Sequence, residues 1–232
     1  VNVDYCSRPD YLGPLCLLRE GSLFGMNLLF RKIPLLLDPF DFERYEDNVR
    51  EYYAGATDLE SGKAAYLAPR KAGELMGTLM ASCSLPYVSP PVSVAGKRYL
   101  DGGIADSIPV RKPLADGCDR LVVVLTQPRG FRKDVSGEGR FKGKVTRAIT
   151  RALYGKYPEF CEALLTRNRR YNETLDFIDG LEKAGQAITV RPEVQPGLDR
   201  LERDPLVLDG LYRSGYADAS ALSARLREAA LR

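Results

Sequence analysis

The sequence predicts an α/β fold in which helices cover a mainly parallel sheet. Strand-like and helix-like segments alternate along the chain, which is the pattern of layered α/β domains. Apolar residues make up 44% and charged residues 28% of the 232 residues, close to the average of globular proteins. This composition excludes a disordered or low-complexity chain, and the length suits one large domain or two small ones.

The first predicted elements are a hairpin, a helix and a second pair of strands. Residues that favour strands flank the turn-forming segment Glu60–Lys63, so a hairpin is expected over Val49–Pro69. A helix follows over Ala72–Cys83 and ends before Pro86. Two short strands come next, at Val92–Val94 and Arg98–Leu100.

The second half of the sequence predicts two strands and three helices. A strand at Leu121–Leu125 leads through a Gly-rich loop into a basic helix around Val145–Leu153. Apolar residues then recur at helical spacing over Pro158–Leu181. A strand at Ala187–Arg191 precedes a last helix that runs from Asp204 to the C-terminus, with the aspartate as its cap and a proline at its first position. The glycines of the loop are Gly130, Gly137, Gly139 and Gly143.

Two absences limit the chemistry of the chain. There is no histidine, so no Ser-His-Asp triad, Cys-His dyad or His-ligated metal site can form within these residues. The cysteines are odd in number and include no C-x-x-C pair, which favours reduced, mostly buried thiols in a cytosolic protein. They are Cys6, Cys16, Cys83, Cys118 and Cys161. No apolar run approaches the roughly 18 residues that a membrane span needs.

The stretch Met80–Val110 is the most informative part of the sequence. It reads as a helix that ends in small residues, then a hairpin, then Asp101 directly after the second strand. The glycines at 102 and 103 permit unusual backbone conformations and leave room beside the carboxylate. An aspartate at such a strand end can reach into a site, although Asp-Gly-Gly is also an ordinary turn sequence.

Taken together, these motifs resemble the patatin-like phospholipase family, in its bacterial branch. The resemblance is carried by Ala81–Pro86, Pro90–Val92, Tyr99–Gly103 and Asp106–Pro109. It continues in Ser22–Gly25, Leu37–Phe42, Ala56–Asp58, Leu121–Pro128, Arg170–Asn172 and Glu202–Pro205, so that it covers nearly the whole chain.

The resemblance implies a lipid acyl hydrolase, a carboxylic-ester hydrolase of the phospholipase A or esterase type, built on a Ser–Asp dyad without cofactor or metal. By position, Asp101 is the Asp of that dyad, which fits a sequence without histidine. An aspartate with a pKa near 3.9 in solution is a weak base, so Asp101 must be held within reach of the serine hydroxyl. The implied fold is a three-layer α/β/α sheet domain over residues 1–140, with a mainly helical region over 141–232 packed on it.

The sequence departs from the family at the nucleophile. No G-x-S-x-G elbow occurs, and in Gly21–Gly25 the serine comes one position early. The chain also opens on Val1 with residues typical of a segment interior, so we expect the sequence to be truncated and the serine and oxyanion loop to lie upstream. This chain alone is therefore predicted to be inactive. The alternative is a catalytically inactive lipid-surface or protein-binding module.

Other side chains near Asp101 in the sequence have both a structural and a functional interpretation. Ser82 and Ser84 could act as nucleophiles, but neither lies in an activating elbow, and helix-end packing is the alternative. Asp106 could bind a cation together with Asp101, yet two carboxylates make a poor site, and a turn role is the alternative. Cys83 is expected to be a small buried hydrophobe.

Positive charge is concentrated in the segment Arg129–Lys156, which holds nine basic and two acidic residues and so has a net charge of +7. The segment could make peripheral contact with an anionic membrane or form a solvated loop and helix face. No nucleic-acid partner is expected, because the sequence contains no recognisable binding motif. The predicted location is cytoplasmic, peripheral to a membrane.

Overall fold

The computed structural model describes residues 2–47, 50–135, 141–193, 197, 201–223 and 227. The chain divides into two compact units. Unit 1 comprises Val1–Ser7, Pro109–Lys133 and Asn172–Arg232, and unit 2 comprises Arg8–Ile108 and Asp134–Tyr171. Both helices and sheets are present, so the chain is a mixed α/β protein as predicted. A division into residues 1–140 and 141–232 stays a prediction.

Unit 2 is built on a four-stranded sheet in which every neighbouring pair is antiparallel. The strands are β1 (Ala54–Asp58), β2 (Ala64–Leu67), β3 (Val92–Val94) and β4 (Lys97–Asp101), in the order β2-β1-β4-β3. The prediction of a mainly parallel sheet is therefore wrong for this unit. Short turns join β1 to β2 and β3 to β4, and strands joined in this way can only pair antiparallel. A parallel pair would need a crossover connection of a dozen or more residues.

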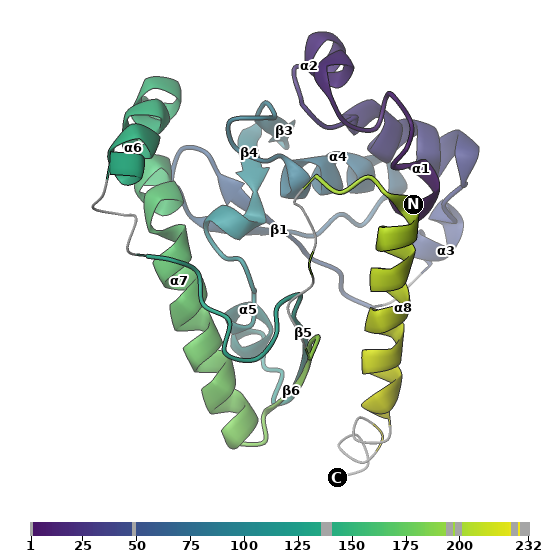
Figure 1. The fold of residues 1–232 in the computed structure, drawn as a ribbon, viewed down its shortest axis with the longest axis vertical. Helices are drawn as coiled ribbons and strands as arrows, with labels where there is room; N and C mark the ends of the chain where they lie inside the picture. The colour runs from purple at the N-terminus through teal and green to yellow at the C-terminus, as the bar shows by residue number, and fades with distance from the viewer. Residues whose placement is uncertain are drawn as a thin grey trace. The chain divides into compact units, whose positions relative to one another are not determined.

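Helix α4 (Ala72–Cys83) covers this sheet, with the bounds that the sequence predicts. It contacts β1, β3 and β4 and buries Leu75, Thr78 and Ala81 (Figure 1). Ala81 joins Ala56 and Tyr99 in one core cluster, so the helix end that carries the small residues lies directly on the strands. Small side chains allow this close approach.

Three short helices precede the sheet in unit 2, and the sequence predicted none of them. They are α2 (Pro14–Glu20), the π-helical η1 (Leu28–Leu37) and α3 (Phe42–Glu46). The residues before α2 are joined to those after it by the Leu12–Phe24 bridge and by a 2.9 Å hydrogen bond from Gly13 N to Leu23 O. Pro34 inside η1 removes a backbone donor, which explains why this run gave no clear helix signal.

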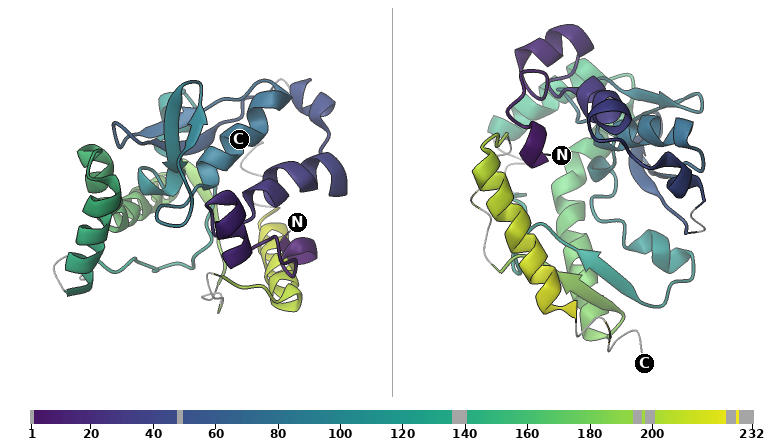
Figure 2. Two further views of the ribbon diagram at one scale, coloured as in Figure 1. Left: turned by 90° about the horizontal axis from the view of Figure 1, so that it is seen from above. Right: turned by 90° about the vertical axis from the view of Figure 1, so that its right-hand side faces the viewer.

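Helices α6 and α7 complete unit 2, and the C-terminal part of α7 belongs to unit 1. Helix α6 (Phe141–Tyr154) is longer than predicted, and α7 (Pro158–Lys183) begins at the predicted residue. Both views in Figure 2 show α6 beside the first turns of α7. Tyr154 and Phe160 pack with their ring centroids 5.0 Å apart, and both join Leu59 and Leu100 in the main core cluster. The predicted Gly-rich loop falls largely on residues 136–140, outside the described residues.

Unit 1 contains the short helices α1 (Asn2–Tyr5) and α5 (Arg111–Ala115), the strands β5 (Leu121–Val124) and β6 (Ala187–Val190), and helix α8 (Pro205–Ala221). β5 and β6 pair in parallel, as the sequence predicted for the sheet as a whole. Asp204 caps α8 by accepting a 2.9 Å hydrogen bond from Leu206 N. None of the helices in the described part of the chain is both long and apolar enough to cross a membrane.

Candidate functional site

Asp101 is the last residue of β4, where the backbone leaves the sheet. Its backbone is fixed on both sides: its N–H donates to Ser84 O at 2.7 Å, and its carbonyl accepts from Thr57 Oγ1 at 2.8 Å. Its carboxylate Oδ1 accepts from Gly103 N at 2.7 Å and caps the short 3₁₀ turn Gly102–Ile104. The half-buried Asp101 is thus held by α4, β1 and the turn that follows it.

The two glycines after Asp101 have different structural roles. A Cβ on Gly102 would lie 2.6 Å from the carbonyl carbon of Gly55 and 3.1 Å from Ala56 N, both backbone atoms of β1. A Cβ on Gly103 would lie 2.9 Å from Asp101 Oδ1. Gly102 therefore allows the close contact with β1, while Gly103 leaves space beside the carboxylate, as the sequence predicted.

The three side chains at the end of α4 face different surroundings. Ser82 donates a 2.6 Å hydrogen bond to Gly55 O and so links α4 to β1. Ser84 is fully buried, and among the described residues its hydroxyl has no hydrogen-bond partner. Cys83 is exposed, so the expectation of a buried hydrophobe is wrong. Local desolvation and then the nearby charge of Asp101 nevertheless raise the pKa of the Cys83 thiol.

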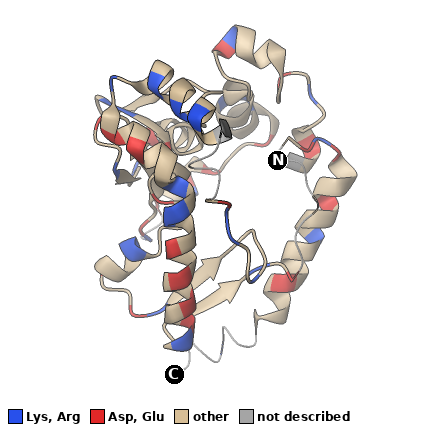
Figure 3. Ribbon diagram, turned by 60° about the vertical axis from the view of Figure 1, so that its left-hand side comes forward, with Lys and Arg blue, Asp and Glu red and all other residues tan. Residues whose placement is uncertain are grey.

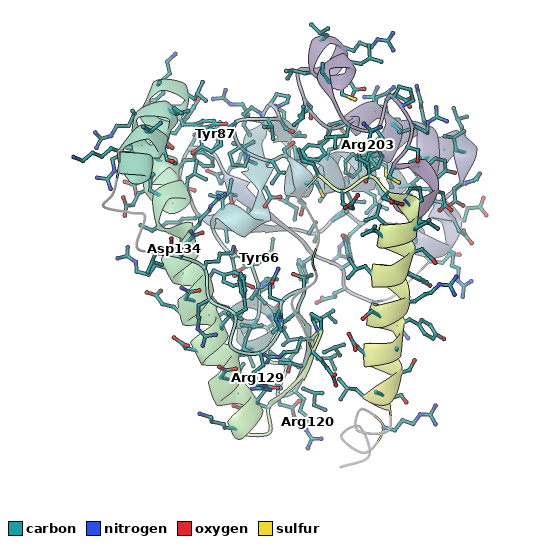
Figure 4. The ribbon with its side chains drawn as sticks, in the orientation of Figure 1. Tyr66, Tyr87, Arg120, Arg129, Asp134 and Arg203 are labelled. Atoms are coloured by element: carbon teal, nitrogen blue, oxygen red, sulfur yellow. The ribbon has the colours of Figure 1, made fainter. Side chains whose placement is uncertain are left out.

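Asp106 lies in the loop beyond the 3₁₀ turn and has its own partner. Tyr66 Oη donates to Asp106 Oδ2 at 2.6 Å, and Tyr66 is labelled in Figure 4. Within the described ranges, no group of three or more acidic or cysteine side chains comes together that could hold a metal ion. Asp106 thus ties the loop after Asp101 to β2.

A pocket of about 410 Å³ reaches the end of α4 from the side of α2 and η1. Sequence reasoning missed it, because its walls come from segments whose helices were not predicted. Its lining includes the buried Ser84, the apolar Met80 and Val92, and the cations Arg19 and Arg31. At its rim Asp10 accepts hydrogen bonds from Arg8 at 2.9 Å and from Lys32 at 3.0 Å, and these contacts lower its pKa to about 2.

The basic segment Arg129–Lys156 does not behave as one surface. Arg129 pairs with Glu182 at 3.0 Å, and Arg132 pairs with Asp176 at 2.7 Å, so the first part of the segment is neutralised by acids of α7. Both acids belong to the second half of α7, where Figure 3 shows acidic residues, whereas α6 carries Lys and Arg and no acidic residue. The net positive charge of the segment is therefore concentrated on α6.

The comparisons with known proteins divide the chain in two. Residues 8–114, which include Asp101 and the whole four-stranded sheet, match the family profile described as patatin-like phospholipase. Residues 157–230 match the profile of DUF6363, a domain of unknown function. The first match supports the family resemblance seen in the sequence, and the second covers all of α7 together with β6 and α8.

One curated relative is the uncharacterized protein YjjU of Escherichia coli (strain K12). It is 31% identical to this chain over 129 residues, which cover 53% of this chain and 35% of that protein. The chain thus matches about a third of the length of this relative.

Proposed function

We propose that this chain, whose residues 8–114 match the patatin-like phospholipases, supplies the general base of a hydrolase that cleaves carboxylic esters of lipids. Asp101 is that base, and the serine nucleophile and oxyanion donors lie upstream of residue 1. The observation that carries the proposal is the position of Asp101: a strand-end carboxylate, fixed by a backbone N–H, inside the matched segment. The full domain would be a three-layer α/β/α arrangement around the sheet.

In each half of the reaction, Asp101 accepts one proton and then gives it up. Its carboxylate accepts the proton of the serine hydroxyl as the oxygen attacks the ester carbonyl, and the proton then passes to the leaving alcohol. In the second half, Asp101 accepts a proton from the water that attacks the acyl-serine, and this proton returns to the serine oxygen as its bond to the acyl carbon breaks and the carboxylic acid is released. The Gly103 N–H holds Oδ1 in place, so that the carboxylate is oriented before substrate binds.

The 232-residue chain contains no G-x-S-x-G elbow, so by itself it is predicted to hydrolyse no ester. The lipid substrate would be met at a membrane, with peripheral contact through the segment Arg129–Lys156. A second candidate function is a catalytically inactive lipid-surface or protein-binding module. The absence of the elbow favours that function if the natural protein also lacks an activated serine.

The test is ester hydrolysis by the protein expressed from its natural gene, with whatever sequence precedes residue 1. Asp101→Asn should lower kcat on a p-nitrophenyl ester by at least about 100-fold, the usual contribution of a general base. Asp106→Asn is the matched control, because it removes a carboxylate five residues away that Tyr66 already binds. Equal activity of Asp101→Asn and the wild type would overturn the proposal, as would no activity in the natural protein.

A further inference from the structure

Helix α6 has an apolar face that the described part of the protein leaves uncovered. Val145, Ile149 and Leu153 are exposed by 43%, 48% and 58%, respectively. They are spaced by four residues, so they lie within an arc of about 80° on the helix. Ala148 and Ala152 are also exposed and widen the same face. An apolar stripe of this kind normally faces a core.

The side of α6 that does face the core is a different one. Tyr154 is buried against Phe160, and Thr150 is fully buried, with its hydroxyl 2.6 Å from Tyr87 Oη. Tyr87, labelled in Figure 4, has a positive φ of 71° and donates from its N–H to Tyr154 Oη at 3.0 Å. The helix is therefore anchored through Thr150 and Tyr154, and its Val-Ile-Leu face points away from this anchor.

Cations occupy the flank between these two faces. Lys144, Arg147 and Arg151 follow one another at spacings of three and four residues, and α6 carries no acidic residue (Figure 3). A helix with an exposed apolar face and a cationic flank has the arrangement of helices that lie in the interface of an anionic bilayer.

A pocket of about 480 Å³ adjoins this cationic flank. Arg147 and Arg151 line it from α6, and Arg167 and Arg169 line it from α7, against the two carboxylates of Asp134 and Glu162. Among the described residues, no ion pair is formed by Arg151, Arg167 or Arg169. The lining therefore carries an excess of two positive charges, which suits a phosphate-bearing headgroup.

We propose that α6 and this arginine-lined pocket bind the surface of an anionic phospholipid bilayer, with Val145, Ile149 and Leu153 entering the boundary between headgroups and acyl chains. The charge alone would also suit a nucleic acid, but the adjacent apolar face has no role in phosphate-backbone binding. The inference rests on the proposed function, since it names the surface through which a lipid hydrolase would meet its substrate. It also restricts the proposed membrane contact of the segment Arg129–Lys156 to α6, because Arg129 and Arg132 are already paired with acidic residues of α7.

A single introduced tryptophan provides a direct test, because the sequence contains none. Leu153→Trp on α6 and Leu206→Trp on α8 place the indole at exposed leucines on different helices; Leu206 is exposed by 81%. With vesicles of phosphatidylcholine and phosphatidylglycerol, the emission of Leu153→Trp should shift to the blue and be quenched by brominated acyl chains. The emission of Leu206→Trp should not change. No shift at Leu153→Trp, or equal shifts at both positions, would overturn the proposal.

The charge requirement is tested by sedimentation with the same vesicles. Arg151→Gln/Arg167→Gln should weaken binding about tenfold or more at low salt, since each removed cation contributes to attraction by anionic lipid. Arg19→Gln/Arg31→Gln removes the same charge from the other pocket and should bind like the wild type. Equal weakening by both pairs would indicate net charge alone and contradict the proposal, as would tighter binding of a DNA duplex than of vesicles.

A separate arm of the experiment distinguishes headgroup binding in a bilayer from binding of free phosphate. Inorganic phosphate should not compete with the anionic vesicles when the total ionic strength is held constant. Vesicles of phosphatidylcholine alone should bind the protein weakly. Complete displacement by inorganic phosphate would overturn the bilayer assignment. Binding is measured without turnover, so loss of hydrolysis in Asp101→Asn and loss of vesicle binding in the α6 variants are independent results. Circular dichroism of each variant confirms that the fold is retained.

Discussion

Replacement of Gly102 by alanine tests the contact that places Asp101. The added Cβ would meet the backbone of β1, 2.6 Å from the Gly55 carbonyl carbon, so a strand or the turn must move. Backbone cannot yield as a flexible side chain does, and overpacking of this kind costs about 1–3 kcal/mol. For a chain of this size, each kcal/mol lowers the melting temperature by about 2–4 °C, so we expect a fall of about 2–12 °C.

Thermal unfolding followed by circular dichroism measures this fall, and Gly55→Ala is the matched control. Gly55 lies on the other side of the same contact, yet a Cβ built on it meets nothing within 4 Å. Its melting temperature should therefore stay close to that of the wild type. In the natural protein, Gly102→Ala should also reduce ester hydrolysis, since movement of the turn displaces the neighbouring carboxylate. A variant Gly102→Ala as stable as Gly55→Ala would refute the reasoning.

Two further predictions concern charge. The Asp101 carboxylate helps to raise the pKa of the Cys83 thiol, so Asp101→Asn should lower that pKa and speed alkylation of Cys83 at pH 8. Peptide mass mapping measures the rate, with alkylation of the exposed Cys118 as the internal control. An unchanged alkylation rate of Cys83 would contradict an electrostatic effect of Asp101 on this thiol. The pKa of Asp10 is lowered from 3.8 to about 2, first by the hydrogen bond from Arg8, so its stabilisation is present above about pH 4 and is lost as the pH falls through 2. Asp10→Asn should therefore cost up to about 2 kcal/mol in urea unfolding at pH 7, less after screening of its exposed partners, and only a small fraction of that at pH 2. An equal loss at both pH values would show that the charge is not responsible.

Elements with strong local signals were predicted well from the sequence. Helix α4 has the predicted bounds, because a run of good helix formers ends before Pro86. The predicted hairpin and the β3–β4 pair formed around their turns, and Asp204 caps α8 as expected. These features depend on residues within a few positions of one another, which a sequence shows directly.

Features that depend on distant segments could not be predicted in this way. The antiparallel pairing of β1 with β4 joins residues more than forty positions apart. The composition of the two strands does not indicate whether they pair parallel or antiparallel. The surroundings of Asp101 come from three separate segments: Thr57, Ser84 and Gly103. The exposure of Cys83 likewise reflects how α4 packs rather than which residues flank it. The sequence motif therefore suffices to propose Asp101 as a candidate site residue, whereas its contacts required the structure.

We propose that Asp101 activates a serine supplied from outside these 232 residues. The most direct measurement is the intact mass of the protein from its natural source, before and after treatment with a fluorophosphonate, together with Asp101→Asn and the 232-residue chain. We expect a mass well above 25.8 kDa with one phosphonate adduct, much slower adduct formation in Asp101→Asn, and no adduct on the 232-residue chain. A natural protein that gains no adduct, or an adduct on the 232-residue chain itself, would contradict it.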